Sequence, residues 1–120
     1  SMYFQGGVFS YSNKLKEQLL QVPAETLRQH GAVSQKVAEA MANGIRRLGQ
    51  VDFGAAVTGI AGPSGGTPEK PVGLVYIAVA DAAGVHSRRY EWRGAREIIK
   101  QRAAQALLNL IRQRILEANI

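Results

Sequence analysis

The chain has 120 residues, of which 46% are hydrophobic and 20% charged, and this composition is typical of one globular domain. It contains no cysteine, which excludes disulfides and thiol chemistry, and its two histidines stand alone at His30 and His86, so we expect no metal site. The formal net charge is +6, but the basic residues are scattered, which favours a basic surface over a nucleic-acid-binding one.

The first part of the chain predicts one strand followed by helices. Residues 6–12 are rich in β-branched and aromatic side chains and predict a strand. Asn13 is a suitable N-cap for a helix that Pro23 ends, and a short helical turn follows. Ser34 then caps a longer helix with apolar residues at helical spacing, and Gly49 closes it.

The remaining elements predict a sheet with a long closing helix. Residues 51–61 and 73–82 are apolar and predict strands, the first of them in the interior of the sheet. Residues 85–94 alternate as a hairpin partner nearer the edge, and residues 95–118 form the last helix. The order predicts an α/β fold, in which a mixed sheet is covered by helices on both faces in three layers.

The stretch TGIAGPSGGTPEKPVG, residues 58–73, lies between two predicted strands, and we call it the glycine loop. Its glycines allow positive φ or a bare backbone close to a ligand, and its prolines stiffen it. It follows the carboxyl end of a strand, where α/β sheets commonly bind ligands, and successive N–H groups there can bind an anion. The alternative is a rigid connection between strands that binds nothing.

The same loop, extended to TGIAGPSGGTPEKPVGLVYIA, resembles the signature of the CinA C-terminal domain family, whose best-understood members are nicotinamide-nucleotide amidases. The stretches YFQGGVFSYSNKLKEQLLQVPAETLRQHGAVSQKVAEAMANGIRR and RRYEWRGAREIIKQRAAQALL are similar to the flanking units of that family, so the resemblance covers nearly the whole chain. Two positions depart from the family pattern. Ser64 replaces a glycine, and Ala95 stands where an acidic or amide residue often precedes the arginine.

The resemblance also implies an opening helix and strand that carry an E-S-C-T-G-G motif, whose serine is the family's nucleophile. No part of this chain matches that motif. We therefore expect residues 1–120 to form a CinA C-terminal-like amidase domain that lacks its first helix and strand. As such a fragment, it is expected to be inactive in hydrolysis.

The activity that the resemblance implies is hydrolysis of nicotinamide mononucleotide to nicotinic acid mononucleotide and ammonia, a step of NAD recycling. It uses a serine–lysine mechanism without metal or cofactor, because a serine hydroxyl needs a neighbour that takes its proton. In YSNKLK, Lys16 matches the family's lysine and is the expected base, and Tyr11 is the expected hydrogen-bonding or proton-relay partner. Lys14 is the rival base. The alternatives are a solvated helix lysine for Lys16 and a packed core ring for Tyr11.

The expected substrate-binding residues lie in the glycine loop or after it, with one exception. Thr58, with the backbone of Gly59 and Gly62, is expected to contact the nucleotide, and Arg96 to hold its phosphate through a planar, bidentate guanidinium. The alternative for Arg96 is a surface salt bridge. Asn13 is a further candidate contact, although a helix cap is the stronger interpretation for it.

The expected partner is a small-molecule nucleotide, with a homo-oligomer as the assembly and neither nucleic acid nor membrane as a partner. No apolar run approaches the about 18 residues of a membrane helix, and no signal-peptide pattern is present, so we expect a cytoplasmic protein. Glu69 and Lys70 are expected to pair with each other or with a neighbouring subunit. The alternative function is a catalytically silent nucleotide-binding or partner domain of a longer CinA-like, competence-damage protein. A basic nucleic-acid-binding domain is the third hypothesis.

Overall fold

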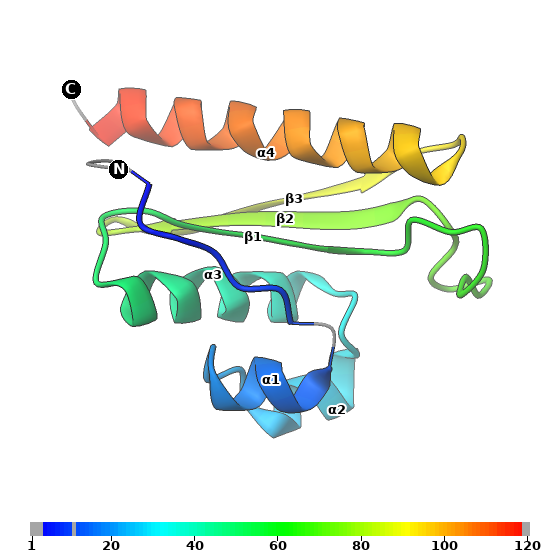
Figure 1. Cartoon of the computed structure of the whole chain (residues 1–120), viewed down its shortest axis with the longest axis horizontal. Helices are drawn as coiled ribbons and strands as arrows, with labels where there is room; N and C mark the ends of the chain where they lie inside the picture. Colours follow the sequence, from blue (N-terminus) through cyan, green and yellow to red (C-terminus); the bar gives the residue numbers. More distant parts are fainter. Residues whose placement is uncertain (1–3, 11, 119–120) are drawn as a thin grey trace.

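The computed structural model describes residues 4–10 and 12–118. Within these residues the chain forms helices and strands in the order α1 (Asn13–Gln18), α2 (Ala24–His30), α3 (Gln35–Gly49), β1 (Gly54–Gly59), β2 (Leu74–Asp81), β3 (Gly84–Glu91) and α4 (Arg96–Ala118) (Figure 1).

The strands form one sheet in the order β1-β2-β3, with α4 packed on one face and α3 on the other. Helices α1 and α2 lie beyond α3, on the side away from the sheet (Figure 1). The predicted fold class, an α/β arrangement with helices on both faces of a sheet, is therefore confirmed. The predicted hairpin and the long last helix also form where the sequence placed them.

Two details of the predicted sheet differ from the structure. Residues 6–10 are irregular and belong to no described strand, and the side chain of Phe9 is 87% exposed. A strand needs a hydrogen-bonded neighbour, and without this one the described pairs, β1 with β2 and β2 with β3, are both antiparallel instead of mixed. For the same reason β1, predicted to be interior, lies at an edge of the described sheet, and β2 is its middle strand.

The middle strand β2 contributes side chains to two parts of the core, one on each face of the sheet. The side chains on one face are small and those on the other are larger. Ala78 and Ala80 face α3, whereas Val75, Ile77 and Val79 face α4. Successive residues of a strand point to opposite faces, so one apolar run supplies both halves of the core. The small alanines let the α3 backbone pack close to the sheet, and the larger aliphatic side chains fill the space below α4.

Serine side chains cap two of the helices. The Ser34 hydroxyl accepts a hydrogen bond from the backbone N–H of Val37 at 3.3 Å, which confirms the predicted cap of α3. At α1 the cap is Ser12, whose hydroxyl accepts from the N–H of Leu15 at 3.1 Å. The prediction of Asn13 as that cap was wrong by one residue, because either side chain can cap a helix and the local pattern does not choose between them.

Helix α1 is shorter than the sequence predicted. It ends at Gln18 instead of running to Pro23, because the N–H of Val22 donates to the carbonyl of Lys16 at 3.0 Å. Gln21 adopts a left-handed conformation with φ 56°, which turns the chain back toward the helix end. Lys16 therefore lies in the last turn of a short helix.

Gly44 lets the segment that follows α1 pack on α3. A Cβ at this position would lie 1.9 Å from the carbonyl oxygen of Leu20, which no alanine can accept without a shift of the backbone. We expect Gly44→Ala to lower the free energy of unfolding in urea by about 1–3 kcal/mol through overpacking. Gly49→Ala is the matched control, because its Cβ would meet only the methyl groups of Val51 at 3.5 Å. Equal stability of the two variants would contradict this packing.

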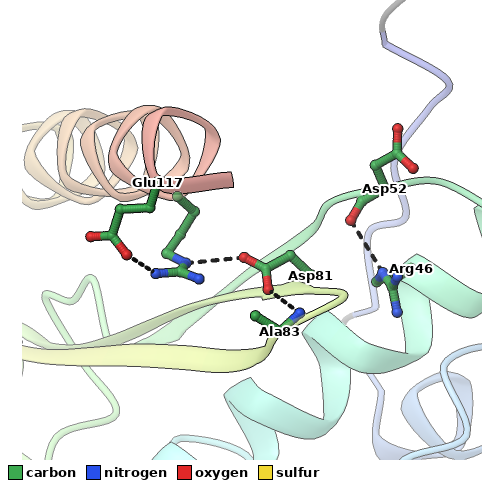
Figure 2. A network of polar contacts seen from close by, with 6 residues as sticks. Arg46, Asp52, Asp81, Ala83 and Glu117 are labelled. Carbon is green, nitrogen blue, oxygen red and sulfur yellow. Dashed lines mark hydrogen bonds and ion pairs between the residues drawn. The ribbon is translucent and has the colours of Figure 1, made fainter. Parts of the chain in front are cut away.

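A network of polar contacts joins the C-terminal end of α4 to the sheet (Figure 2). Arg114 of α4 donates to the carboxylate of Asp81 at 3.0 Å, and the N–H of Ala83 donates to the other carboxylate oxygen at 2.8 Å. Burial alone would raise the pKa of Asp81, but these hydrogen bonds and the charge of Arg114 outweigh it and lower that pKa. Arg114 also pairs with Glu117, one turn further along the helix.

Candidate functional site

The ends of several elements gather at one end of the molecule, on the right of Figure 1. Strand β1 and helix α2 end there, and α1, α3 and α4 begin there. The glycine loop, whose first two residues end β1, lies at the same end and joins β1 to β2. The N-termini of α3 and α4 carry the positive ends of their helix dipoles, which favours an anion here.

Lys16 is a buried cation in the last turn of α1. Its side chain belongs to a residue that is only 6% exposed, and its Nζ donates to the carbonyl of Ser10 at 2.5 Å. Burial lowers the pKa of Lys16, because the charged ammonium is poorly solvated there. The alternative interpretation, a solvated helix lysine, is therefore wrong, and a buried amine of this kind can act as a general base.

The structure says less about the other site residues expected in and just before α1. Lys14, the rival base, is exposed on the outer side of α1, and Asn13 is exposed at the first position of the helix. Tyr11, the expected partner of Lys16, lies outside the described residues. The structure thus separates the two lysines by burial and leaves the roles of Tyr11 and Asn13 as predictions.

Thr58 is buried where β1 ends. Its residue is 8% exposed, and its hydroxyl donates to the carbonyl of Ala32 at 2.8 Å. The hydroxyl proton is thus engaged within the protein, and the oxygen retains acceptor capacity for a ligand. This bond ties β1 to residues 31–34, which we call the 31–34 turn, at the start of α3.

Gly59 and Gly62 are both required by close packing within the protein. A Cβ on Gly59 would lie 2.9 Å from the carbonyl oxygen of Leu74 in the neighbouring strand. Gly62 has φ 82°, and a Cβ there would lie 2.5 Å from a methyl group of Val72. These contacts explain both glycines without a ligand, so a nucleotide-binding role for their backbone stays a prediction.

Arg96 begins α4 and reaches back to the glycine loop. Its Nη1 donates to the carbonyl of Gly62 at 3.1 Å. A guanidinium has five N–H donors, and that of Arg96 makes no other hydrogen bond or ion pair with the residues that the structure describes. The alternative of a surface salt bridge is therefore wrong within that part of the chain, and the remaining donors are available to an anion.

The structure brings some of the predicted residues together and leaves others apart. Arg96 and Gly62 are joined directly, and Thr58 is joined to the 31–34 turn. None of the described hydrogen bonds of Lys16 reaches the glycine loop, and they join it instead to the segment before α1 and to the turn after it.

Lys70 has a contact that the sequence did not predict. Its Nζ donates to the carbonyl of His30, the last residue of α2, and it pairs with neither Glu69 nor any other described carboxylate. The expected pairing of Glu69 with Lys70 within the chain was therefore wrong. No local pattern could have indicated this contact, because the two residues are 40 positions apart.

Comparison with known proteins gives the family context. Residues 1–115 match the family model described as the CinA C-terminal domain. A CinA-like protein of Anaeromyxobacter sp. (strain K) is 53% identical over 106 residues, which are 88% of this chain and 26% of that protein. A CinA-like protein of Geobacter sulfurreducens is 48% identical over 118 residues, which are 98% of this chain and 29% of that protein. The chain thus spans between a quarter and a third of the length of these curated relatives.

Solved structures agree with the sequence comparison. The competence/damage inducible protein CihA from Agrobacterium tumefaciens superposes with a TM-score of 0.82 at 38% identity, covering 85% of this chain and 63% of that one. The competence damage-inducible protein A (ComA) from Klebsiella pneumoniae gives a TM-score of 0.82 at 33% identity, over 88% of this chain and 66% of that one. In the part of the chain described here, every helix is too short or too polar to cross a membrane.

Proposed function

The chain belongs to the CinA C-terminal domain family, and on this premise we propose that it supplies the general base and the nucleotide-binding part of a nicotinamide-nucleotide amidase. The proposed reaction hydrolyses the carboxamide of nicotinamide mononucleotide, giving nicotinic acid mononucleotide and ammonia. The observation that carries the proposal is that Lys16 is buried beside the carbonyl of Ser10. This burial lowers the pKa of its ammonium group.

In the proposed mechanism, the neutral amine of Lys16 takes the proton of a serine hydroxyl as that oxygen attacks the carboxamide carbon. The tetrahedral intermediate collapses with loss of ammonia, whose nitrogen receives a proton from the ammonium of Lys16. Water then attacks the acyl-serine with Lys16 again as the base, the ammonium of Lys16 returns this proton to the departing serine oxygen, and the product leaves as nicotinic acid mononucleotide. The serine comes from the family's E-S-C-T-G-G motif, which is not among the residues of this chain.

The substrate's phosphate is proposed to bind at Arg96. Its guanidinium has donors left over after its bond to Gly62, and it stands in the first turn of α4, where the helix dipole adds positive potential. The glycine loop and the acceptor oxygen of Thr58 would lie along the rest of the nucleotide. In this proposal a charge-assisted contact at Arg96 holds the phosphate, while the carboxamide at the other end of the nucleotide reaches Lys16.

A second candidate is a silent nucleotide-binding domain. It is favoured by the hydrogen bonds of Arg96 and Thr58, neither of which involves Lys16. In that case the nucleotide binds but is not hydrolysed, and the buried amine of Lys16 has only a structural role.

The test of the proposed function has two arms. Calorimetric titration of the chain with nicotinamide mononucleotide is expected to show binding. The same chain, extended at its amino end by a relative's segment that carries E-S-C-T-G-G, is expected to release ammonia from that nucleotide. Binding without ammonia release from the extended chain would favour the silent domain, and absence of binding in both forms would reject both candidates.

A further inference from the structure

Lys70 connects the glycine loop to a helix that is distant in sequence. Within the loop, its N–H donates to the hydroxyl of Thr67 at 3.0 Å, and its carbonyl accepts from the N–H of Thr67 at 2.8 Å. Its backbone is therefore held inside the loop. Its side chain leaves the loop and donates to the carbonyl of His30 at the end of α2.

The site on α2 suits an ammonium group. His30 is the last residue of the helix, so its carbonyl has no partner within the helix and carries the negative end of the dipole. The next residue, Gly31, has φ 76°, and a Cβ on it would lie 2.8 Å from the Nζ of Lys70. Glycine at this position thus ends the helix and also leaves room for the ammonium.

The same short segment receives two more side-chain hydrogen bonds. Thr58 donates to the carbonyl of Ala32 at 2.8 Å, and Ser34 donates to the carbonyl of Gly31 at 2.9 Å. The glycine loop is therefore held to residues 30–32 at two points, by Thr58 at its beginning and by Lys70 near its end. The bond from Arg96 to Gly62 holds the part of the loop between them.

We propose that Lys70 is a positioning residue, which keeps the glycine loop in the conformation that receives the nucleotide; this rests on the proposed function. A glycine-rich loop loses much conformational freedom when it is fixed. Where the loop is already fixed in the free protein, the ligand does not bear that cost on binding. Lys70 acts on the loop and not on the phosphate, so its loss affects a nucleotide and its phosphate-free riboside alike.

The experiment compares Lys70→Met, which has similar length but no donor, with Lys70→Arg, which retains a donor. Lys36→Met is the matched control, because Lys36 is exposed at the start of α3 and its change removes the same charge at the same end of the molecule. Hydrogen exchange of the ligand-free chain is followed by mass spectrometry. Faster exchange is expected in the glycine loop and in residues 28–32 of Lys70→Met, and not in Lys36→Met.

Calorimetry with nicotinamide mononucleotide and nicotinamide riboside then measures the effect on binding. In Lys70→Met both affinities should fall by a similar factor of about five, and Lys70→Arg should recover most of the loss. Unchanged exchange in the loop of Lys70→Met, or faster exchange with unchanged affinities, would overturn the proposal. If neither the parent chain nor the chain extended by the E-S-C-T-G-G segment binds either ligand, the proposed function itself fails, and with it the nucleotide role of Lys70. The exchange arm still decides whether Lys70 tethers the loop.

Discussion

Lys16→Met should abolish ammonia release from nicotinamide mononucleotide in the chain extended by the E-S-C-T-G-G segment, while the nucleotide still binds. Methionine fills a similar volume but takes no proton, so the serine would lose its base. General base catalysis of this kind contributes about 10²–10⁴-fold in rate, and removal of a group that acts as a unit with the nucleophile can cost more. Initial rates of ammonia release and calorimetric affinities measure the two quantities separately.

The dependence of this activity on pH follows from the burial of Lys16. Only the neutral amine accepts a proton, so the parent's rate should rise with pH as Lys16 loses its proton. Because burial lowers its pKa, the midpoint of this rise should lie below the pKa of an ordinary lysine, about 10.4. Lys14→Met, in the exposed lysine two positions away, should leave both the rate and this profile unchanged. An active Lys16→Met, or an inactive Lys14→Met that still folds, would contradict the assignment.

Arg96→Lys should weaken the binding of nicotinamide mononucleotide about tenfold, which corresponds to about 1.4 kcal/mol. Lysine keeps the positive charge but loses the planar fork that can bind a phosphate and the carbonyl of Gly62 together. Nicotinamide riboside lacks the phosphate, so its affinity should change much less. Calorimetric titration of both ligands against the parent and the variant measures the difference.

Arg93→Lys is the control for this experiment, because Arg93 is an exposed arginine shortly before α4. Its affinities for both ligands should equal those of the parent. An equal loss of nucleotide and riboside binding in Arg96→Lys would show that Arg96 acts on the loop and not on the phosphate. The distinction matters because Lys70 is proposed to act on the loop and not on the phosphate.

Local patterns in the sequence predicted the elements well where the determinant lies within a few residues. The apolar runs predicted β2 and β3 as a hairpin, and Ser34 predicted the start of α3. Strand order was not predictable in the same way, because it depends on which strands pair with one another. In the described sheet β1 pairs only with β2 and therefore lies at an edge. The strand predicted at 6–12 failed for a related reason, since its side chains suit a strand but no described strand pairs with it.

The candidate site shows the same limit. The spacing in YSNKLK does not distinguish a buried lysine from a solvated one, and only the family resemblance favours Lys16 over Lys14. The structure adds the burial that makes this selection chemically sensible. Lys70 was missed because its partner, the carbonyl of His30, is a backbone group that any residue type supplies.

The unequal halves of the core have a consequence for how this sequence tolerates change. On the α3 side, the strands contribute the small, buried residues Ala56, Ala78 and Ala80, so we expect a larger residue at any of these positions to overpack against α3. On the α4 side, larger residues such as Val75 and Ile77 can exchange volume with their neighbours. Substitutions of similar total volume should therefore be accepted between the sheet and α4, whereas between the sheet and α3 we expect the alanines to tolerate little increase in size.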